Sequence, residues 1–345
     1  MMHVLECLCW KRSGRIMLDT PRQTGLEPLL GGDRTLATTS GDEPALGGMR
    51  LIRMLRDHLL RELYNPQMPE RRRMAVGDWL AEVGDPRPGT GLDARGLPDL
   101  DWVEVPAGYV QVSDYIMPFE VRRFWVARYP VTWAQYRAFL EAEDGHLCPD
   151  WWEGLRRRPE YEREVYLRDN QPAQEVSWYD AAAYCRWLSA RTGIEVRLPT
   201  EWEWEMAAGG GAATRVFTWG HLWQAGYANT RESGLRRSLA VGMYPHAPAA
   251  CGALDMSGNV LEWCQNEFAE PHRVDPSPRL RVYRGGSWFL VREASRIRWR
   301  SGNDPYLRYN SVGFRLACDD PWALPPIEGP EPAVEEPTET GEAAG

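Results

Sequence analysis

Long apolar segments are absent from the sequence. None of its 345 residues falls in a run of 18 consecutive apolar residues, the length that a membrane-spanning helix needs. The first fifteen residues, MMHVLECLCWKRSGR, place the apolar part before the basic part. A secretory signal begins with its charge and ends at a small-residue cleavage site. We therefore expect a cytoplasmic protein with no membrane contact.

Lysine is almost missing, because Lys11 is the single lysine among 40 basic residues. The remaining cations are arginines, which are always charged and carry planar donor groups. The net charge is −9, yet residues 281–315 hold eight arginines against Glu293 and Asp304. After Arg315 there is no basic residue, and six glutamates follow. The basic window therefore says more about partners than the acidic total does.

Paired cysteine motifs are also lacking. The seven cysteines form no CxxC pair and no zinc-finger spacing, and they are Cys7, Cys9, Cys148, Cys185, Cys251, Cys264 and Cys318. Such an odd set is typical of free buried thiols in a reducing compartment. A disulfide between Cys251 and Cys264 remains an open alternative.

Several catalytic signatures are missing as well. The sequence contains no GxSxG nucleophile turn, no GxxxxGK[ST] phosphate loop and no HExxH zinc motif. The run Gly209-Gly210-Gly211 follows a predicted helix and is better explained as a helix terminator than as a phosphate loop.

Two helices are predicted ahead of the main domain. Residues 1–48 lack sustained periodicity and are predicted to be disordered. The stretch 49–64 places four leucines at helical spacing, namely Leu51, Leu55, Leu59 and Leu63. A second helix is bounded by Pro69 and Gly84. We interpret 49–99 as a helical docking or capping segment with a linker.

From residue 100 to 320 the pattern changes to an α+β domain with little regular secondary structure. WVEVPAGYVQV alternates apolar and polar residues like a half-buried strand. Two helices are predicted from capping boxes, with Thr132 followed by Gln135 and Ser177 followed by Asp180. Residues 321–345 form a predicted disordered acidic tail.

Six segments of this domain resemble the formylglycine-generating enzyme, or sulfatase-modifying factor, family. They occur in the family's order and are YPVTWAQYRAF (129–139), QPAQEVSWYDAAAYCRWLSARTG (171–193), RLPTEWEWEMAAGGG (197–211), MSGNVLEWC (256–264), RGGSW (284–288) and VGFRLAC (312–318). The resemblance implies a C-type-lectin-like fold. Most of these residues also have a purely structural interpretation: Thr200 can cap a helix, tryptophans fill a core, and two glycines allow a tight turn.

The resemblance implies two calcium sites. One would use Asn259, the carbonyl of Val260 and Glu262, which is reasonable oxygen chemistry for calcium. The other would use Asn229 and Thr230, but Ser233 stands where the family has an aspartate. The alternative for Glu262 is a buried carboxylate that accepts from backbone amides.

The family's copper-binding cysteines are replaced. The two positions that follow the GGS turn fall on Leu290 and Ser295, and neither side chain supplies the thiolate that Cu(I) requires. We therefore expect no copper and no formylglycine synthesis. A non-haem iron branch of the family would need two converging histidines, yet none of the six histidines lies four residues from another.

Without these cysteines, the segment 289–312 resembles the ligand-binding face of retroelement variable proteins of the same fold. The predicted contact residues are the types that dominate binding hot spots, and they are Phe289, Leu290, Arg292, Arg298, Trp299, Arg300, Tyr306, Arg308 and Tyr309. The alternative is that half of the aromatics are core and the arginines form a solvated rim.

These observations predict a non-catalytic module that binds a protein or a small molecule through the 289–310 face, a diversified variable protein being one form of it. The alternative is a metal-dependent oxidoreductase of the sulfatase-modifying factor family. Nucleic acid is disfavoured as a partner, because the rest of the chain is acidic.

Overall fold

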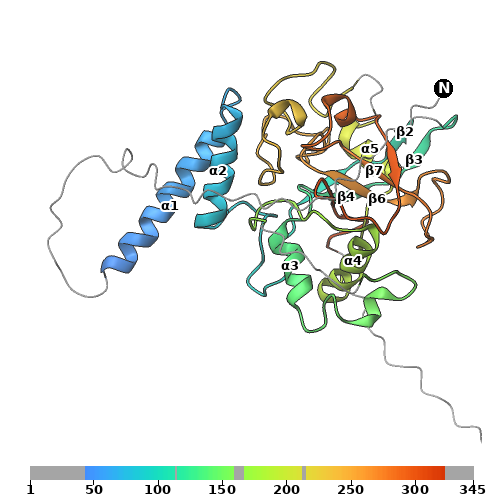
Figure 1. Ribbon diagram of the computed structural model, residues 1–345, viewed down its shortest axis with the longest axis horizontal. Coiled ribbons are helices and arrows are strands. Elements are labelled where there is room, and N and C mark those ends of the chain that lie inside the picture. The colour runs from blue at the N-terminus through green and yellow to red at the C-terminus, as the bar shows by residue number, and fades with distance from the viewer. Residues whose placement is uncertain (1–42, 113–114, 159–166, 212–214, 323–345) are drawn as a thin grey trace, which may run out of the picture. The chain divides into compact units, whose positions relative to one another are not determined.

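The structure is a computed structural model, and it describes residues 43–112, 115–158, 167–211 and 215–322 (Figure 1). The predicted disorder of residues 1–42 and 323–345 lies outside these ranges, whereas residues 43–48, which were also predicted to be disordered, are helical. The chain divides at Gly48, and the unit described below begins at Met49. Among the described helices, none combines the length and apolarity that crossing a bilayer would require.

The predicted N-terminal helices are present as α1 (Glu43–Leu63) and α2 (Glu70–Val83). Of the four leucines at helical spacing, Leu59 and Leu63 are buried, whereas Leu51 is 56% exposed. The buried pair packs against α2 and against the segment around Met243 and Tyr244. Arg73 of α2 is fully buried and donates to the carbonyl of Met243 at 2.6 Å. This pair of helices therefore covers part of the domain, as a capping segment does.

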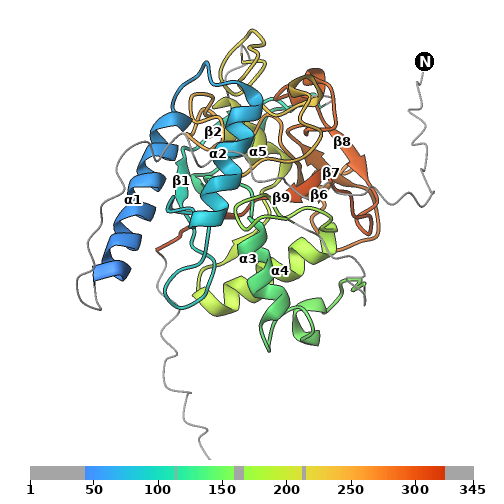
Figure 2. The same cartoon turned by 60° about the vertical axis from the view of Figure 1, so that its left-hand side comes forward.

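Short strands build the sheets, several of which are labelled in Figures 1 and 2, and the described residues contain ten of them. The strands are β1 (Trp102–Val105), β2 (Gly108–Val110), β3 (Phe119–Val121), β4 (Phe124–Ala127), β5 (Val196–Arg197), β6 (Leu261–Glu267), β7 (Arg281–Arg284), β8 (Ser301–Asn303), β9 (Val312–Phe314) and β10 (Ala317–Cys318). One sheet has the order β1-β4-β10-β5, another has β8-β7-β6-β9, and β2 pairs with β3. Only the β6–β9 pairing is parallel among the strand pairs of the described residues.

The three main helices of the domain begin at the predicted caps. They are α3 (Trp133–Glu141), α4 (Trp178–Thr192) and α5 (Glu201–Gly209). Thr132, Ser177 and Thr200 each form a complete capping box with the residue three positions later. Figures 1 and 2 both place α3 beside α4.

Tryptophans fill the core, and three of them donate their ring N–H groups to buried acceptors, whereas the ring N–H of Trp187 has no hydrogen-bond partner among the described residues. Trp178 donates to the carbonyl of Cys264 at 2.9 Å, and Trp263 donates to the carbonyl of Val176 at 2.9 Å. Trp204 donates to the carboxylate of Glu262 at 2.7 Å. Each of these rings is buried, so an unpaired N–H there would be costly.

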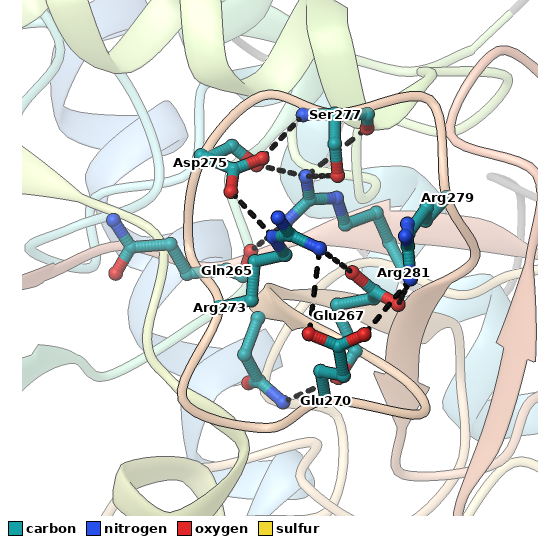
Figure 3. A network of polar contacts seen from close by, with 9 residues as sticks. Gln265, Glu267, Glu270, Arg273, Asp275, Ser277, Arg279 and Arg281 are labelled. Carbon is teal, nitrogen blue, oxygen red and sulfur yellow. Dashed lines mark hydrogen bonds and ion pairs between the residues drawn. The ribbon is translucent and has the colours of Figure 1, made fainter.

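An arginine network fixes the connection between β6 and β7 (Figure 3). Arg281 is fully buried and donates to the carbonyls of Gln265 at 2.9 Å and Ser277 at 3.1 Å. Its guanidinium lies 4.2 Å from the ring centroid of Trp178. At the surface of the same loop, Glu270 joins Arg273 to Arg279. The loop is therefore tied to the sheet by buried arginine contacts.

The five cysteines of the described residues are free, including Cys251 and Cys264, for which a disulfide had remained open. Burial raises the pKa of the Cys264 thiol well above its usual value and that of Cys318 to about 12. Burial therefore disfavours the thiolate form of both side chains, which makes them poor nucleophiles.

A candidate ligand-binding groove

The eight arginines of residues 281–315 separate into two groups. Five have buried guanidinium groups with acidic or carbonyl partners, and they are Arg281, Arg284, Arg300, Arg308 and Arg315. The remaining three, Arg292, Arg296 and Arg298, are exposed. The second group is the one whose side chains reach the surface.

Arg284 and Arg300 belong to a buried cluster around Glu201. Arg284 donates to Glu201 and to Glu205, each at 2.6 Å. Arg300 donates to both carboxylate oxygens of Glu201, at 2.6 and 2.8 Å, and its side chain is 8% exposed. The adjacent arginines hold the pKa of Glu201 below its usual value against the effect of burial. Arg300, which we predicted on the ligand face, therefore points into the protein.

Arg308 is also internal. It donates to both oxygens of Asp180, at 2.7 and 2.6 Å, and its side chain is 9% exposed. Because Asp180 is the capping-box residue of α4, this pair anchors the 305–310 loop to a helix start. Arg308 therefore has a structural role in this geometry.

The aromatic residues predicted on the ligand face are divided in the same way. Leu290, Trp299 and Tyr306 are partly buried and pack against the larger core cluster. Phe289 is 60% exposed and Tyr309 is 36% exposed. The solvent-facing part of the predicted surface is therefore smaller than the sequence pattern indicated.

The three exposed arginines all line one groove of about 560 Å³. Residues 292–298 form one wall, and residues 215–223 form the other. The backbone joins the walls, because the N–H of Ile297 donates to the carbonyl of Val216 at 2.8 Å. This volume lies within the range that ligand pockets occupy. We call this feature the arginine groove.

The charge of the arginine groove is strongly positive. Arg215 joins the three exposed arginines, and Glu293 is the one acidic residue in the lining. Glu293 accepts from Nε of Arg292 at 3.1 Å, and this hydrogen bond lowers the pKa of Glu293. Arg215 is held by donation to the carbonyl of Thr218 at 2.8 Å. Several guanidinium groups thus face one open space with little acidic compensation.

A smaller cavity of about 30 Å³ adjoins the groove and shares Arg215 and Arg298 with it. Glu205 lines this cavity and is almost fully buried. Burial raises the pKa of Glu205, while Arg284 acts in the opposite direction. A buried acid therefore lies behind the cationic wall and attracts Arg298.

The opposite wall is aromatic. Phe217 stacks on Trp219 with ring centroids 5.2 Å apart, and Trp223 meets both rings edge to face. The N–H of Trp219 donates to the carbonyl of Leu222 at 3.0 Å. Leu222 itself is 72% exposed. The wall is a packed aromatic cluster with an apolar rim.

Eight groove residues were not predicted from the sequence, and they are Arg215, Val216, Phe217, His221, Leu222, Trp223, Glu293 and Arg296. Their clearest sequence signal is the FTWGHLW stretch at 217–223, which holds three aromatic residues outside any regular element. Nothing local in the sequence pairs it with residues 292–298.

The two positions of the family's cysteines lie in the arginine-bearing segment. Leu290 is half-buried, and Ser295 is fully buried with its hydroxyl donating to the carbonyl of Arg292 at 2.7 Å. The Gly285-Gly286 turn packs directly on this segment: a Cβ on Gly286, whose φ is +72°, would lie 2.8 Å from the backbone of Ser295. The local backbone is closely packed, but no thiol occupies either position.

The side chains predicted as calcium ligands already form hydrogen bonds with other groups of the protein. Both oxygens of Glu262 accept from Arg315, and one also accepts from Trp204. The side-chain oxygen of Asn259 accepts from the N–H of Leu239 at 2.9 Å. A carboxylate neutralised by a guanidinium does not fit a calcium ligand in this geometry. The alternative interpretation of Glu262 as a buried carboxylate agrees with its burial, although its partners are side chains.

The second predicted calcium set has similar contacts. The side-chain oxygen of Asn229 accepts from the Ser233 hydroxyl at 2.9 Å, and the Thr230 hydroxyl donates to Glu232 at 2.7 Å. Within the described ranges, no three or more His, Cys, Asp or Glu side chains are grouped so that they could hold a metal ion. Calcium binding stays a prediction, and we build no function on it.

Residues 98–320 match the sulfatase-modifying factor enzyme 1-like domain. The chain belongs to this family. It is 38% identical to the formylglycine-generating enzyme of Streptomyces coelicolor, covering 49% of this chain and 61% of that protein. It is 31% identical to the hercynine oxygenase of Mycolicibacterium thermoresistibile, covering 58% of this chain and 52% of that protein. The chain thus spans between half and two thirds of the length of these relatives.

Solved structures confirm the C-type-lectin-like fold of the formylglycine-generating-enzyme type. Treponema denticola variable protein 1 superposes with a TM-score of 0.50 at 23% identity, covering 64% of this chain and 96% of that protein. At 23% identity, this structural similarity supports the fold assignment alone.

Proposed function

We propose that this family member is a non-catalytic binding module whose arginine groove takes an anionic ligand, either a small molecule or an acidic segment of a protein. One observation carries the proposal: the three exposed arginines of the basic window all line the same groove. Guanidinium groups pair with carboxylate or phosphate in a planar, bidentate geometry. The aromatic wall supplies apolar contact beside this charge.

The replaced cysteines support a binding role over oxidase chemistry. Cu(I) in this family's chemistry requires soft thiolate ligands, and Leu290 and Ser295 cannot provide them. The remaining thiols near this region are protonated, because burial raises the pKa of Cys264 well above its usual value. A binding module needs no such ligand.

A labelled decaglutamate peptide is a suitable probe, with binding followed by fluorescence anisotropy. We expect binding that weakens as salt is added, because the contacts are between exposed charges. Arg296→Glu and Arg298→Glu should each weaken it by about ten-fold, since each variant replaces attraction with repulsion. The matched control is Arg122→Glu, which reverses an exposed arginine outside the groove. Equal binding by all four proteins would overturn the proposal.

The diversified form of this proposal concerns residues 289–310. The fold that the chain shares with a protein named as variable motivates it. Comparing this gene segment between sibling clones tests it, because an invariant segment would exclude diversification while leaving ligand binding intact.

The second candidate is a metal-dependent oxidoreductase, and the similarity to a formylglycine-generating enzyme and to a hercynine oxygenase favours it. Elemental analysis of the purified protein, followed by oxygen-uptake measurements with reductant, separates the two candidates. Stoichiometric copper or iron with oxygen uptake would replace the binding-module proposal by an enzyme with a displaced site.

A further inference from the structure

The sequence itself contains a segment with the chemistry that the arginine groove would select. Residues 323–345 hold six glutamates, five prolines and no lysine or arginine. The groove carries four arginines and one glutamate. The two parts of the chain are therefore strongly opposite in charge.

The aromatic wall adds a second point of agreement. Proline-rich segments favour the polyproline II conformation and dock on grooves lined with aromatic side chains. Phe217 and Trp223 supply such side chains in the groove, and Leu222 forms an exposed apolar rim. Acidic and proline residues alternate in PEPAVEEPTE, residues 330–339, so one extended segment offers both kinds of contact.

The length of this segment is sufficient. The described chain ends at Trp322, whose ring meets Trp125 of β4 edge to face with centroids 5.6 Å apart. From that anchor, 23 residues in a polyproline II conformation extend about 70 Å. This exceeds the span of a domain of roughly 220 residues, which is about 40 Å across by its expected radius of gyration.

A second large cavity that contains arginines is less suitable. A cavity of about 450 Å³ next to α1 includes Arg87 and Arg128. Arg87 pairs with Asp85 at 2.5 Å, and Arg128 pairs with Asp101 at 2.5 Å. Each of these two arginines has an acidic partner of its own, whereas a single glutamate lines the arginine groove beside four arginines, so the groove is the better acceptor for an acidic segment.

We infer that the acidic segment 323–345 docks in the arginine groove of the same molecule and competes with the groove's external ligand. This inference rests on the proposed function and goes further by naming one occupant. Glutamates would pair with Arg292, Arg296 and Arg298, and prolines would pack against the aromatic wall. The segment then sets the threshold of affinity or concentration that an external anion must exceed.

The test uses the full chain with Glu335, Glu336 and Glu339 each changed to Gln. We expect this tail variant to bind labelled decaglutamate about ten-fold more tightly than the wild type, because three competing charges are removed. The matched control changes three exposed glutamates outside the tail to Gln, namely Glu104, Glu120 and Glu143. The control equalises the change in net charge, and its affinity should stay within about two-fold of the wild type.

The outcomes separate the two proposals. If the tail variant and the wild type bind the probe equally, the tail inference is wrong and the groove proposal stands. If neither the wild type nor the tail variant binds the probe, the groove proposal fails. If the control variant gains as much as the tail variant, the effect is one of net charge and the inference is wrong.

A second measurement distinguishes docking within a molecule from docking between molecules. Sedimentation velocity over a hundred-fold range of protein concentration should show no association for docking within one chain. Concentration-dependent association of the wild type that the tail variant loses would assign the segment to a second copy, and would overturn the inference as stated.

Discussion

Arg315 and Glu262 form a fully buried ion pair with two hydrogen bonds, at 2.7 Å from Nε and 2.6 Å from the second guanidinium nitrogen. Arg315 also donates to the carbonyls of Ala127 and Leu254. The pair thus joins β6, the end of β4 and the 254 turn to the last strands of the domain.

Removing one partner of this pair should strongly destabilise the protein. We expect Arg315→Met to lower the free energy of unfolding by about 3–5 kcal/mol, because it leaves Glu262 as an unpaired buried charge. Urea denaturation followed by tryptophan fluorescence measures this change. The double variant Arg315→Met with Glu262→Leu should cost clearly less than the sum of the single variants, since it leaves no unpaired charge. Additive costs would show that the two side chains are energetically independent.

The same pair bears on calcium. Because Arg315 already neutralises Glu262, we expect the melting temperature to be the same, within about 1 °C, in calcium and in chelator. Differential scanning fluorimetry in matched buffers checks this, with magnesium at the same concentration as the control for ionic strength. A rise of several degrees specific to calcium would instead support the sites predicted from the family resemblance.

Buried and groove arginines should separate by their effects. Arg308→Ala removes the bidentate partner of buried Asp180, and we expect it to lower the free energy of unfolding by about 3 kcal/mol. Arg298→Ala exchanges an exposed side chain and should change stability by no more than about 0.5 kcal/mol while weakening decaglutamate binding. Denaturation and anisotropy on both variants provide the comparison. A destabilised Arg298→Ala protein would place that arginine with the structural group.

Asp255 predicts a pH-dependent contribution to stability. Burial raises its pKa from 3.8 to about 6, opposed by the N–H of Gly242 and by Arg315 and Arg87. The folded state therefore holds this proton more tightly than the unfolded state. The contribution is fully present below about pH 4 and is lost as the pH rises through 6.

The variant Asp255→Asn keeps an acceptor for Gly242 but does not titrate. The free energy of unfolding of the variant, minus that of the wild type, should therefore rise by about 3 kcal/mol between pH 4 and 7. Urea denaturation at closely spaced pH values measures this difference and cancels the titration of all other groups. A difference that stays flat over this range would contradict the raised pKa.

Features governed by nearby residues were well predicted from the sequence. The capping boxes at Thr132 and Ser177, and the cap at Thr200, follow rules that span three residues, and the structure confirms all three. The end of α4 at Gly193 is equally local, since that glycine adopts the left-handed conformation with φ of +73°. The fold as a whole was predicted from the six family motifs, because they occur along the chain in the family's order.

The division of the arginines could not be predicted in this way. Arg308 pairs with Asp180 across 128 residues of sequence, and Arg300 pairs with Glu201 across 99. Whether an arginine forms a core ion pair or lies at the surface depends on such distant partners. The local sequence RIRWR, residues 296–300, contains exposed arginines and the buried Arg300, so it does not distinguish the two kinds. The prediction of the groove was incomplete for the same reason, because its aromatic wall comes from a segment about 75 residues earlier in the sequence.

The hydrogen bond that joins the two walls of the groove affects which groove positions can be substituted. The contact that fixes them is made by backbone atoms of Ile297 and Val216, and the side chain of Ile297 is buried while its neighbours at 296 and 298 are exposed. Side chains at those two positions can therefore be exchanged without loosening the frame that presents them. We therefore expect a library of variants at positions 296 and 298 to yield altered ligand specificities with little loss of folding yield.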